Sequence, residues 1–165
     1  METLFLLSPL RPASIFTTDL PSMHSSKFSL FVEAQDPIYD QVRSELSKGQ
    51  KQSHWMWFIF PQLKGLGSSA MAIKFGIDSL EEAKAYLHDP VLGQRLKECT
   101  KLMLALESND AHAILGSPDD LKFRSSMTLF ALAGPEEPMF TEALEKFFGG
   151  TRDQRTIELL GNRQP

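Results

Sequence analysis

Apolar residues beyond position 26 recur at intervals of three and four, the spacing that places side chains along one side of an α-helix. The clearest series is Leu92, Leu96, Cys99, Met103 and Leu106, with successive intervals of four, three, four and three residues. Strict alternation of apolar and polar positions, or runs rich in Val and Ile, would predict strands, and the sequence offers neither at useful length. The pattern therefore predicts an all-α fold.

Capping residues stand at the ends of the predicted helices. Ser79 and Glu82 have the spacing of a capping box, in which each side chain satisfies a free amide of the first turn. The Asp-Pro pairs at 36–37 and 89–90 combine a capping carboxylate with a proline suited to the first helical position, and Gly161 ends the last helix. The predicted helices span residues 36–48, 79–88, 90–106, 117–132, 140–148 and 151–160, with a shorter one at 70–75. They predict a single domain with irregular helix packing.

The first 26 residues differ from the rest of the chain. They contain three prolines and many Ser and Thr, and their only charged residues are Glu2, Arg11 and Asp19. We expect the chain to divide into a disordered extension (1–26), a helical domain (27–161) and a short tail (162–165). The apolar run Leu4–Leu7 is too short for the core of a secretory signal. One arginine against two acids does not favour a transit peptide, so we expect a cytoplasmic protein, with organelle import as the alternative.

Composition excludes several classes of protein. The 165 residues carry 17 basic and 21 acidic side chains, and a formal net charge of −4 argues against coating nucleic acid by bulk charge. No segment has 18 uninterrupted apolar residues, so we expect no membrane span. Cys99 is the single cysteine, which excludes an intramolecular disulfide, and the four histidines lack metal-binding spacing. We therefore expect no metal and no cofactor.

The segment 54–69, HWMWFIFPQLKGLGSS, is the first candidate for a binding site. It holds both tryptophans of the chain, Trp55 and Trp57, and a dense aromatic cluster is ordinarily a core nucleus. A glycine-containing loop then leads into the predicted 70–75 helix, and helix starts fed by such loops bind anions through free amides. The candidate ligand-binding residues of this loop are Gln62, Lys64, Gly65, Gly67 and Ser68.

Charge is unevenly distributed around this segment. Between residues 46 and 77 the chain has four lysines and no Asp or Glu, although the whole protein is acidic. A solvated basic face is one interpretation, and a positive cleft that attracts phosphate or carboxylate groups is the other. In the second interpretation Lys51 contacts the ligand. His54, beside the aromatic cluster, is the candidate general base, with a structural histidine as the alternative.

The segment 122–132, KFRSSMTLFAL, is the second candidate. On a helix its polar residues Arg124, Ser125 and Thr128 form a narrow stripe that leucines interrupt, which is typical of a largely covered helix. A covered arginine must pair with a carboxylate or hold an anion, because an isolated buried charge costs on the order of several kcal/mol. Arg155 would join this group if the last helix folds back onto the tryptophan segment.

Four runs of the sequence carry a resemblance to a known family: HWMWFIFPQLKGLG, AKAYLHDPVLGQRLKECT, GSPDDLKFRSSMTLF and FFGGTRDQRTIELLG. They resemble the Domain of Unknown Function 1810 family, and the similarity extends from about Phe28 to Gly161. The resemblance implies a mainly α-helical single domain and no particular activity. The chain departs from the family pattern at Leu30, where members tend to have Arg before the Phe of the opening motif. A shared site that used this arginine would be altered here.

Two functional hypotheses follow. In the first, the two candidate segments line a shared pocket for a phosphorylated or otherwise anionic small molecule, for example a nucleotide stacked on a tryptophan. Hydrolase or transferase activity would follow if His54 acts as base. In the second, the domain is a non-catalytic adaptor whose aromatic and basic surface contacts a protein or RNA. Buried tryptophans would weaken the second hypothesis, because surface aromatics mark interfaces.

Overall fold

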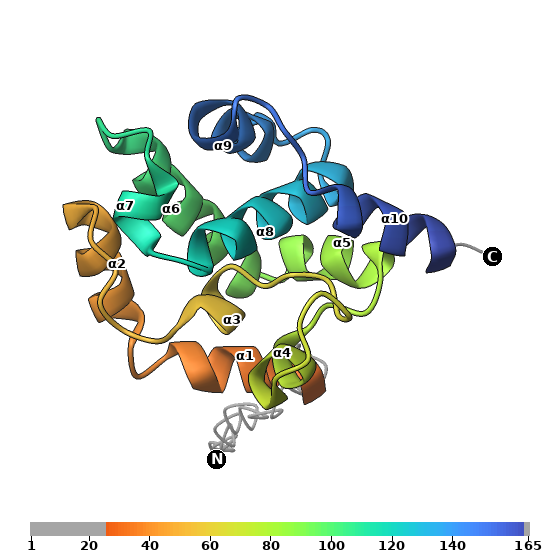
Figure 1. Ribbon diagram of the computed structural model, residues 1–165. Coiled ribbons are helices and arrows are strands. Elements are labelled where there is room, and N and C mark those ends of the chain that lie inside the picture. Colours follow the sequence, from red (N-terminus) through yellow and green to blue (C-terminus); the bar gives the residue numbers. More distant parts are fainter. Residues whose placement is uncertain (1–25, 164–165) are drawn as a thin grey trace, which may run out of the picture.

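The computed structural model describes residues 26–163, and this part of the chain is built from ten helices with no strand among them (Figure 1). Their bounds are α1 Ser26–Gln35, α2 Tyr39–Lys48, α3 Met56–Ile59, α4 Ala70–Phe75, α5 Leu80–His88, α6 Leu92–Ala105, α7 Ala111–Leu115, α8 Asp119–Ala133, α9 Pro138–Phe148 and α10 Gln154–Arg163. The all-α prediction is confirmed. The predicted disordered extension lies outside the described residues except for Ser26, which begins α1, and the last two residues of the predicted tail lie outside them as well.

Helix α8 forms the centre of the domain. In Figure 1 it runs through the middle of the molecule with α9 on one side and α3 on the other, and α5, α7 and α10 also pack against it. Nine of its 15 residues are buried, which confirms the expectation of a covered helix. A helix covered to this extent must find partners for its polar side chains inside the protein.

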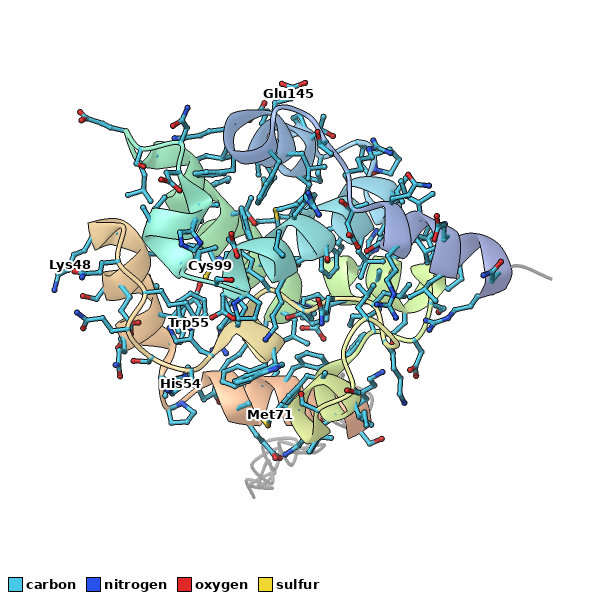
Figure 2. All side chains as sticks on the ribbon, viewed as in Figure 1. Lys48, His54, Trp55, Met71, Cys99 and Glu145 are labelled. Atoms are coloured by element: carbon cyan, nitrogen blue, oxygen red, sulfur yellow. The ribbon has the colours of Figure 1, made fainter. Side chains whose placement is uncertain are left out.

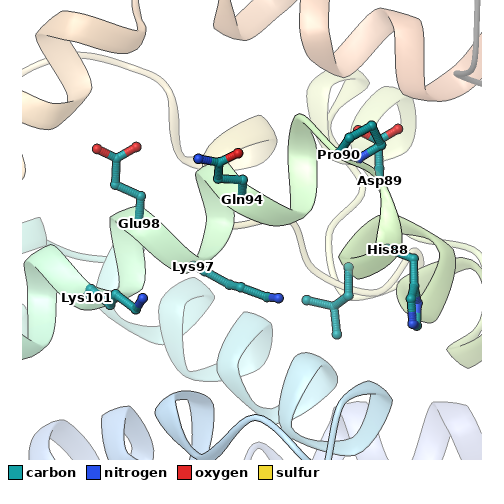
Figure 3. Close-up of a pocket in the computed structure, with 8 residues that line it drawn as sticks. His88, Asp89, Pro90, Gln94, Lys97, Glu98 and Lys101 are labelled. Carbon is teal, nitrogen blue, oxygen red and sulfur yellow. The ribbon is translucent and has the colours of Figure 1, made fainter.

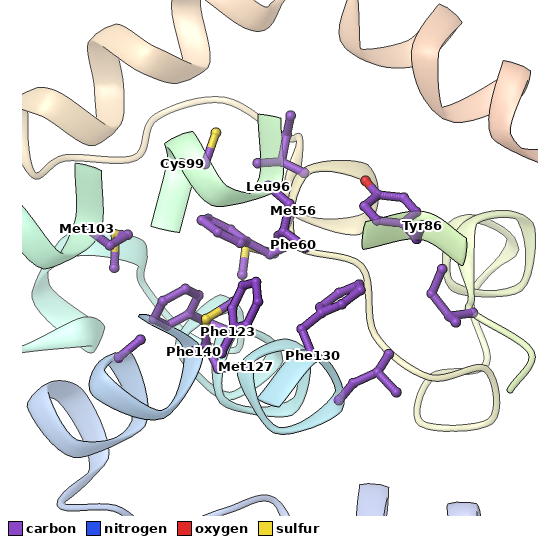
Figure 4. Close-up of a cluster of buried hydrophobic side chains, with 14 of the residues drawn as sticks. Met56, Phe60, Tyr86, Leu96, Cys99, Met103, Phe123, Met127, Phe130 and Phe140 are labelled. Carbon is purple, nitrogen blue, oxygen red and sulfur yellow. The ribbon is translucent and has the colours of Figure 1, made fainter. Parts of the chain in front are cut away.

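Aromatic rings hold α8 to its neighbours. The ring of Phe123 packs edge-on against Phe60 at a centroid distance of 4.9 Å. Further along α8, Phe130 lies 5.5 Å from Tyr86 of α5 and 5.9 Å from Phe140 of α9. Figure 4 shows these rings at the centre of the buried cluster. Because each aromatic side chain buries about 150–250 Å², these contacts fix the aromatic segment that follows α2 to the core.

The predicted caps of α5 and α6 are confirmed. The Ser79 hydroxyl accepts a hydrogen bond from the Glu82 amide at 3.1 Å, and the Glu82 carboxylate accepts one from the Asp78 amide at 2.5 Å. One carboxylate oxygen of Asp89 accepts from two amides at the start of α6, at 3.0 and 2.9 Å. These bonds satisfy amides that a helix start otherwise leaves unpaired.

Several predicted helix ends are wrong, among them the start of α2 and both ends of α10, which begins at Gln154 and not at 151. The prediction placed a start at Asp36, but α2 begins at Tyr39 without a side-chain cap, and the Asp36 carboxylate pairs with Arg95 at 2.8 Å. The last helix does not stop at Gly161 and continues to Arg163. The Arg163 guanidinium stabilises the last turn, because it donates hydrogen bonds to the backbone carbonyls of Lys64 and Asp78 in the segment between α3 and α5.

The segment between α3 and α5, which contains α4, folds back so that its two ends form hydrogen bonds with each other. Leu63 and Ile77 form an isolated parallel bridge, in which the Lys64 amide donates to the Ile77 carbonyl at 2.8 Å. The Ile77 amide donates in turn to the Gln62 carbonyl at 2.9 Å. At Gly76 an added Cβ would lie 2.8 Å from a backbone oxygen and 2.9 Å from the Lys64 Cα. The close approach of the two backbones therefore requires glycine at this position.

Candidate functional site

The predicted site residues fall into three groups, and each group has its own contacts. The first surrounds Trp55, which is fully buried. The Lys51 ammonium lies 5.0 Å from the centroid of the Trp55 ring and pairs with Asp119 of α8 at 2.7 Å. Only 7% of the Lys51 side chain is exposed. Lys51 therefore connects the segment that carries Trp55 to α8, and the Asp119 carboxylate already neutralises its charge.

The buried carboxylate of Glu45 accepts hydrogen bonds from the same segment around Trp55. Glu45 accepts hydrogen bonds from the amides of Gln52 and Ser53 at 2.5 and 2.7 Å. It also accepts from the Ser53 hydroxyl at 2.8 Å and from the Trp55 indole N–H at 3.3 Å. Burial raises the pKa of this carboxyl, but the four hydrogen bonds outweigh burial and hold the pKa below its usual range. Glu45 is thus ionised at neutral pH and fixes the course of the chain into α3.

His54, the candidate general base, lies outside this group. Figure 2 shows its ring at the edge of the molecule, and the side chain is exposed. Within residues 26–163 no hydrogen bond or ion pair joins it to another residue. His54 is exposed because the hydrogen bond to Glu45 turns Trp55 into the core and leaves the neighbouring His54 in solvent.

The second group consists of Trp57 on α3 and the loop between α3 and α4. Trp57 is half-buried, and the Lys122 ammonium of α8 lies 4.8 Å from the centroid of its ring. Trp57, Gln62 and Phe75 contribute to the lining of a small cavity. Its volume is about 10 Å³, room for about one water molecule. Neither tryptophan offers the broad exposed face that the adaptor hypothesis requires, since Trp55 is buried as well.

The remaining loop residues are at the surface or pack against α4. Lys64 and Ser68 are exposed, and Gly65 has a φ of 104°, in the left-handed region that favours glycine. At Gly67 an added Cβ would lie 2.9 Å from a side chain of α4. Ser69 caps α4 by accepting a hydrogen bond from a first-turn amide at 3.1 Å. That cap occupies one of the amides that an anion would use.

The third group lies where α8 meets the start of α10. The Thr128 hydroxyl donates to the Arg124 carbonyl at 2.8 Å and accepts from the Asp153 amide at 2.9 Å. Asp153 in turn caps α10 by accepting from the Thr156 amide at 3.0 Å. The first turn of α10 therefore lies on α8, while its last turn reaches the loop after α3 through Arg163. Of the other predicted residues in this group, Ser125 is buried and Arg155 is exposed.

Arg124 is incompletely paired. Its side chain is 29% exposed, and its Nη2 atom lies 3.9 Å from Oδ1 of Asp153, beyond hydrogen-bonding range. Its Nε atom is buried without a hydrogen-bond partner. The guanidinium carbon lies 5.9 Å from the centroid of the Phe148 ring. A guanidinium in this state gains hydrogen bonds when an oxyanion is added.

A cavity of about 650 Å³ adjoins the Phe148 ring, between α7, the start of α8 and the end of α9. This volume lies in the range of small-molecule sites, about 300–1,000 Å³. Its apolar walls are Ala111, Leu121, Phe147 and Phe148, and its charged or titratable residues are Asp110, His112, Asp120, Glu145 and Lys146. The cavity therefore combines aromatic walls with several hydrogen-bond acceptors.

His112 and Asp120 form a pair in the lining of this cavity. His112 Nδ1 lies 3.4 Å from Asp120 Oδ2, and 67% of the histidine side chain is exposed against 16% of the aspartate. The other carboxylate oxygen, Oδ1, is buried without a partner. Lys146 donates to the carbonyls of Leu104 and Leu106, so its ammonium caps the end of α6.

This pair was not predicted from the sequence. The two residues lie on different helices separated by the turn at Gly116, so no periodic pattern connects them. The only sequence feature that could have suggested the pair is a histidine and an aspartate on either side of one short turn.

A second cavity, of about 540 Å³, lies along the outer face of α6 near its junction with α5 (Figure 3). Lys97 in its lining pairs with Glu137 at 3.1 Å, and Glu98 accepts a hydrogen bond from Tyr39 at 2.6 Å. In Figure 3 Lys97 and Lys101 extend to one side of α6 and Glu98 to the other, so the charged groups do not converge. None of the predicted site residues lines this cavity.

Within residues 26–163, no group of three or more His, Cys, Asp or Glu side chains is placed to hold a metal ion. No helix there is long and apolar enough to cross a membrane.

A family model described as "Protein of unknown function (DUF1810)" matches residues 25–160. The chain belongs to this family. The DUF1810 domain is also similar to a solved structure, that of the conserved hypothetical protein Rv1873 from Mycobacterium tuberculosis at 1.38 Å. The two chains are 51% identical, the match covers 82% of this chain and 96% of the other, and the TM-score is 0.80. No curated protein matches the chain. The predicted family and fold are confirmed, and neither description names an activity.

Proposed function

We propose that this DUF1810 domain binds an anionic small molecule of the phosphorylated class that includes nucleotides. The anionic group binds at Arg124, and the rest of the ligand occupies the cavity between α7, α8 and α9. The incomplete pairing of Arg124 is the observation that carries the proposal. Loop residues 62–69 are not required for it.

Arg124 needs acceptors that the described protein residues do not supply. A guanidinium has five N–H donors, and those of Arg124 make no hydrogen bond to another residue in 26–163. The nearest carboxylate is 3.9 Å away, and its second oxygen already accepts from the Thr156 amide. A phosphate group offers several oxygens in the geometry that a guanidinium binds with two parallel hydrogen bonds. A bound phosphate would therefore supply the missing acceptors at the exposed Nη atoms.

The adjoining cavity suits an organic phosphate better than inorganic phosphate. Phe148 lines the cavity, and the centroid of its ring lies 5.9 Å from the Arg124 guanidinium carbon, so this ring connects Arg124 to the cavity. The carboxylates of Asp110 and Asp120 in the lining repel a second anionic group but accept hydrogen bonds from hydroxyl or amino groups. A sugar phosphate or a nucleotide carries such donors beside its phosphate.

Arg152 and Arg155 lie on either side of Asp153 in the chain, and both are exposed. Thr128 keeps Asp153 against α8 through its hydrogen bond at 2.9 Å. The positive charges on either side of Asp153 would favour the approach of an anion to this segment.

Titration calorimetry of the full chain with AMP, ribose 5-phosphate and inorganic phosphate tests the proposal. We expect binding of at least one organic phosphate at millimolar concentration or below, and weaker binding of inorganic phosphate. Arg124→Gln should lower the affinity for the organic phosphate at least tenfold, because it removes charge-assisted hydrogen bonds to the ligand.

Arg43→Gln is the matched control. Arg43 lies on α2, where it pairs with Glu98 at 2.9 Å, and it does not line the cavity. This variant should bind as the unmodified protein does. Absence of binding by every compound, or an equal effect of the two substitutions, would contradict the proposal.

A further inference from the structure

We propose that protonation of His112 strengthens anion binding in the cavity between α7, α8 and α9. The inference rests on the proposed function and concerns the regulation of that same site.

The geometry of His112 allows it to exchange protons while facing the cavity. Its side chain is 67% exposed, and the ring lies in the cavity lining. Its Nδ1 atom is 3.4 Å from Asp120 Oδ2, so a protonated ring forms an ion pair with that carboxylate. Asp120 is only 16% exposed, and its other oxygen has no hydrogen-bond partner. Within the described residues His112 is thus the group that balances the charge of Asp120.

The other charged residues that line the cavity are Asp110 before α7, Asp120 on α8, and Glu145 and Lys146 on α9. Outside the lining, Arg124 of α8 lies near the Phe148 ring and near Asp153, which precedes α10. Asp119, next to Asp120, pairs with Lys51 and with Lys122 at 2.7 and 3.6 Å. Side chains of the carboxylate, lysine and arginine types ordinarily keep their charge between pH 5 and 8, whereas histidine changes charge in that range.

Proton binding to His112 changes the balance of charge that a ligand meets. With a neutral His112 the cavity lining has three carboxylates against Lys146, whose ammonium is committed to two carbonyls of α6. When His112 is protonated, its positive charge neutralises the negative charge of Asp120. An anion at Arg124 is then repelled less by the carboxylates of the cavity. A unit charge several Å from the anion in a water-like medium changes the affinity about threefold, and more if the site is drier.

The test uses inorganic sulfate as the probe, because sulfate keeps its charge between pH 5.5 and 8.0, whereas a phosphate group titrates near pH 6. Chemical-shift titrations of the ¹⁵N-labelled full chain give the dissociation constant at both pH values. We expect sulfate to bind at least threefold more tightly at pH 5.5 than at pH 8.0. In His112→Gln the affinity should be independent of pH.

Matched controls separate His112 from the other histidines. His54 and His88 are exposed and do not line this cavity, so His54→Gln and His88→Gln should keep the pH dependence of the unmodified protein. Asp120→Asn removes the repelling charge itself. This variant should bind sulfate at pH 8.0 as tightly as the unmodified protein does at pH 5.5.

The outcomes separate this inference from the proposed function. Sulfate binding near Arg124 with the same affinity at both pH values overturns the inference and leaves the proposed function standing. Retention of the full pH dependence in His112→Gln also overturns the inference. If sulfate, AMP and ribose 5-phosphate all leave the residues around Arg124 unperturbed at both pH values, both proposals are contradicted.

Discussion

Replacing Glu45 by alanine is expected to destabilise the domain by about 3 kcal/mol. The carboxylate of Glu45 is the acceptor for four hydrogen bonds, and the residue is only 6% exposed. It connects α2 to the segment that carries Lys51 and Trp55. The substitution therefore tests whether this carboxylate fixes the path of that segment.

The magnitude follows from the donors that the substitution leaves without an acceptor. The Trp55 indole N–H is fully buried, and an unsatisfied buried donor costs about 1–3 kcal/mol. The amides of Gln52 and Ser53 lie nearer the surface, where water replaces the carboxylate in part, so each contributes less. A total of about 3 kcal/mol is a large fraction of the 5–15 kcal/mol that typically stabilises a domain. It corresponds to a fall of about 6–12 °C in Tm.

Urea unfolding followed by far-ultraviolet circular dichroism measures this loss. Glu81→Ala is the control, because the Glu81 side chain is 83% exposed and its ion pair with Lys84 lies within one helix. The control should change the free energy of unfolding by less than about 0.5 kcal/mol.

The pH dependence provides a second check. Hydrogen bonding holds the folded-state pKa of Glu45 below its usual range, and the unfolded value is about 4.3. The contribution of Glu45 is therefore fully present above the unfolded pKa and is lost as pH falls through the folded-state pKa. The gap in stability between the unmodified protein and Glu45→Ala should be constant above about pH 5 and narrow below about pH 4. A loss under 1 kcal/mol at pH 7, or a gap that does not narrow in acid, would refute the reasoning.

Three other substitutions or reactions test the packing. Gly93→Ala should abolish folding, because the added Cβ would lie 2.0 Å from the Leu87 carbonyl oxygen. In the control Gly161→Ala the added Cβ has no atom within 4 Å, so this variant should keep or slightly raise the Tm of the unmodified protein. Equal Tm values of the two variants would contradict this. Lys51→Met should lower the free energy of unfolding by about 2 kcal/mol, since it leaves a carboxylate of α8 without its closest cation, and an unchanged urea midpoint would count against it. Burial raises the pKa of the Cys99 thiol to about 12, so a thiol reagent at pH 8 should react with it only after unfolding; rapid labelling of the folded protein would show that the packing is wrong.

Local chemistry made part of the fold predictable. The caps at Ser79 and Asp89 are set by side chains within a few residues of the amides they satisfy, so the sequence was sufficient to find them. Helix α3 has four residues and α7 has five, too few to show a periodic pattern. In α1 the buried positions are Phe28, Phe31 and Gln35. Because Gln35 is polar, the sequence does not show a continuous apolar side for this helix.

The candidate site was predictable only where it depends on one helix. The sequence indicated that Arg124 is covered, because leucines interrupt the polar stripe in which it lies, but not that the Asp153 carboxylate lies 3.9 Å from it, beyond hydrogen-bonding range. Glu45 resembles a surface residue of an amphipathic helix, and its burial arises from the folding of the next loop onto it. The pair of His112 and Asp120 likewise exists only once α7 and α8 have packed together.

The Nε–Hε resonance of Arg124 gives the most direct test of anion binding. It is assigned by its loss from the ¹H–¹⁵N spectrum of Arg124→Lys, and the full chain is then titrated with AMP. A phosphate bound at the guanidinium should shift this resonance saturably, with the same dissociation constant that calorimetry gives. Anion binding at Arg124 is contradicted if the resonance stays in place while the protein is saturated with AMP, or if Arg124→Lys and Arg124→Gln bind AMP as tightly as the unmodified protein.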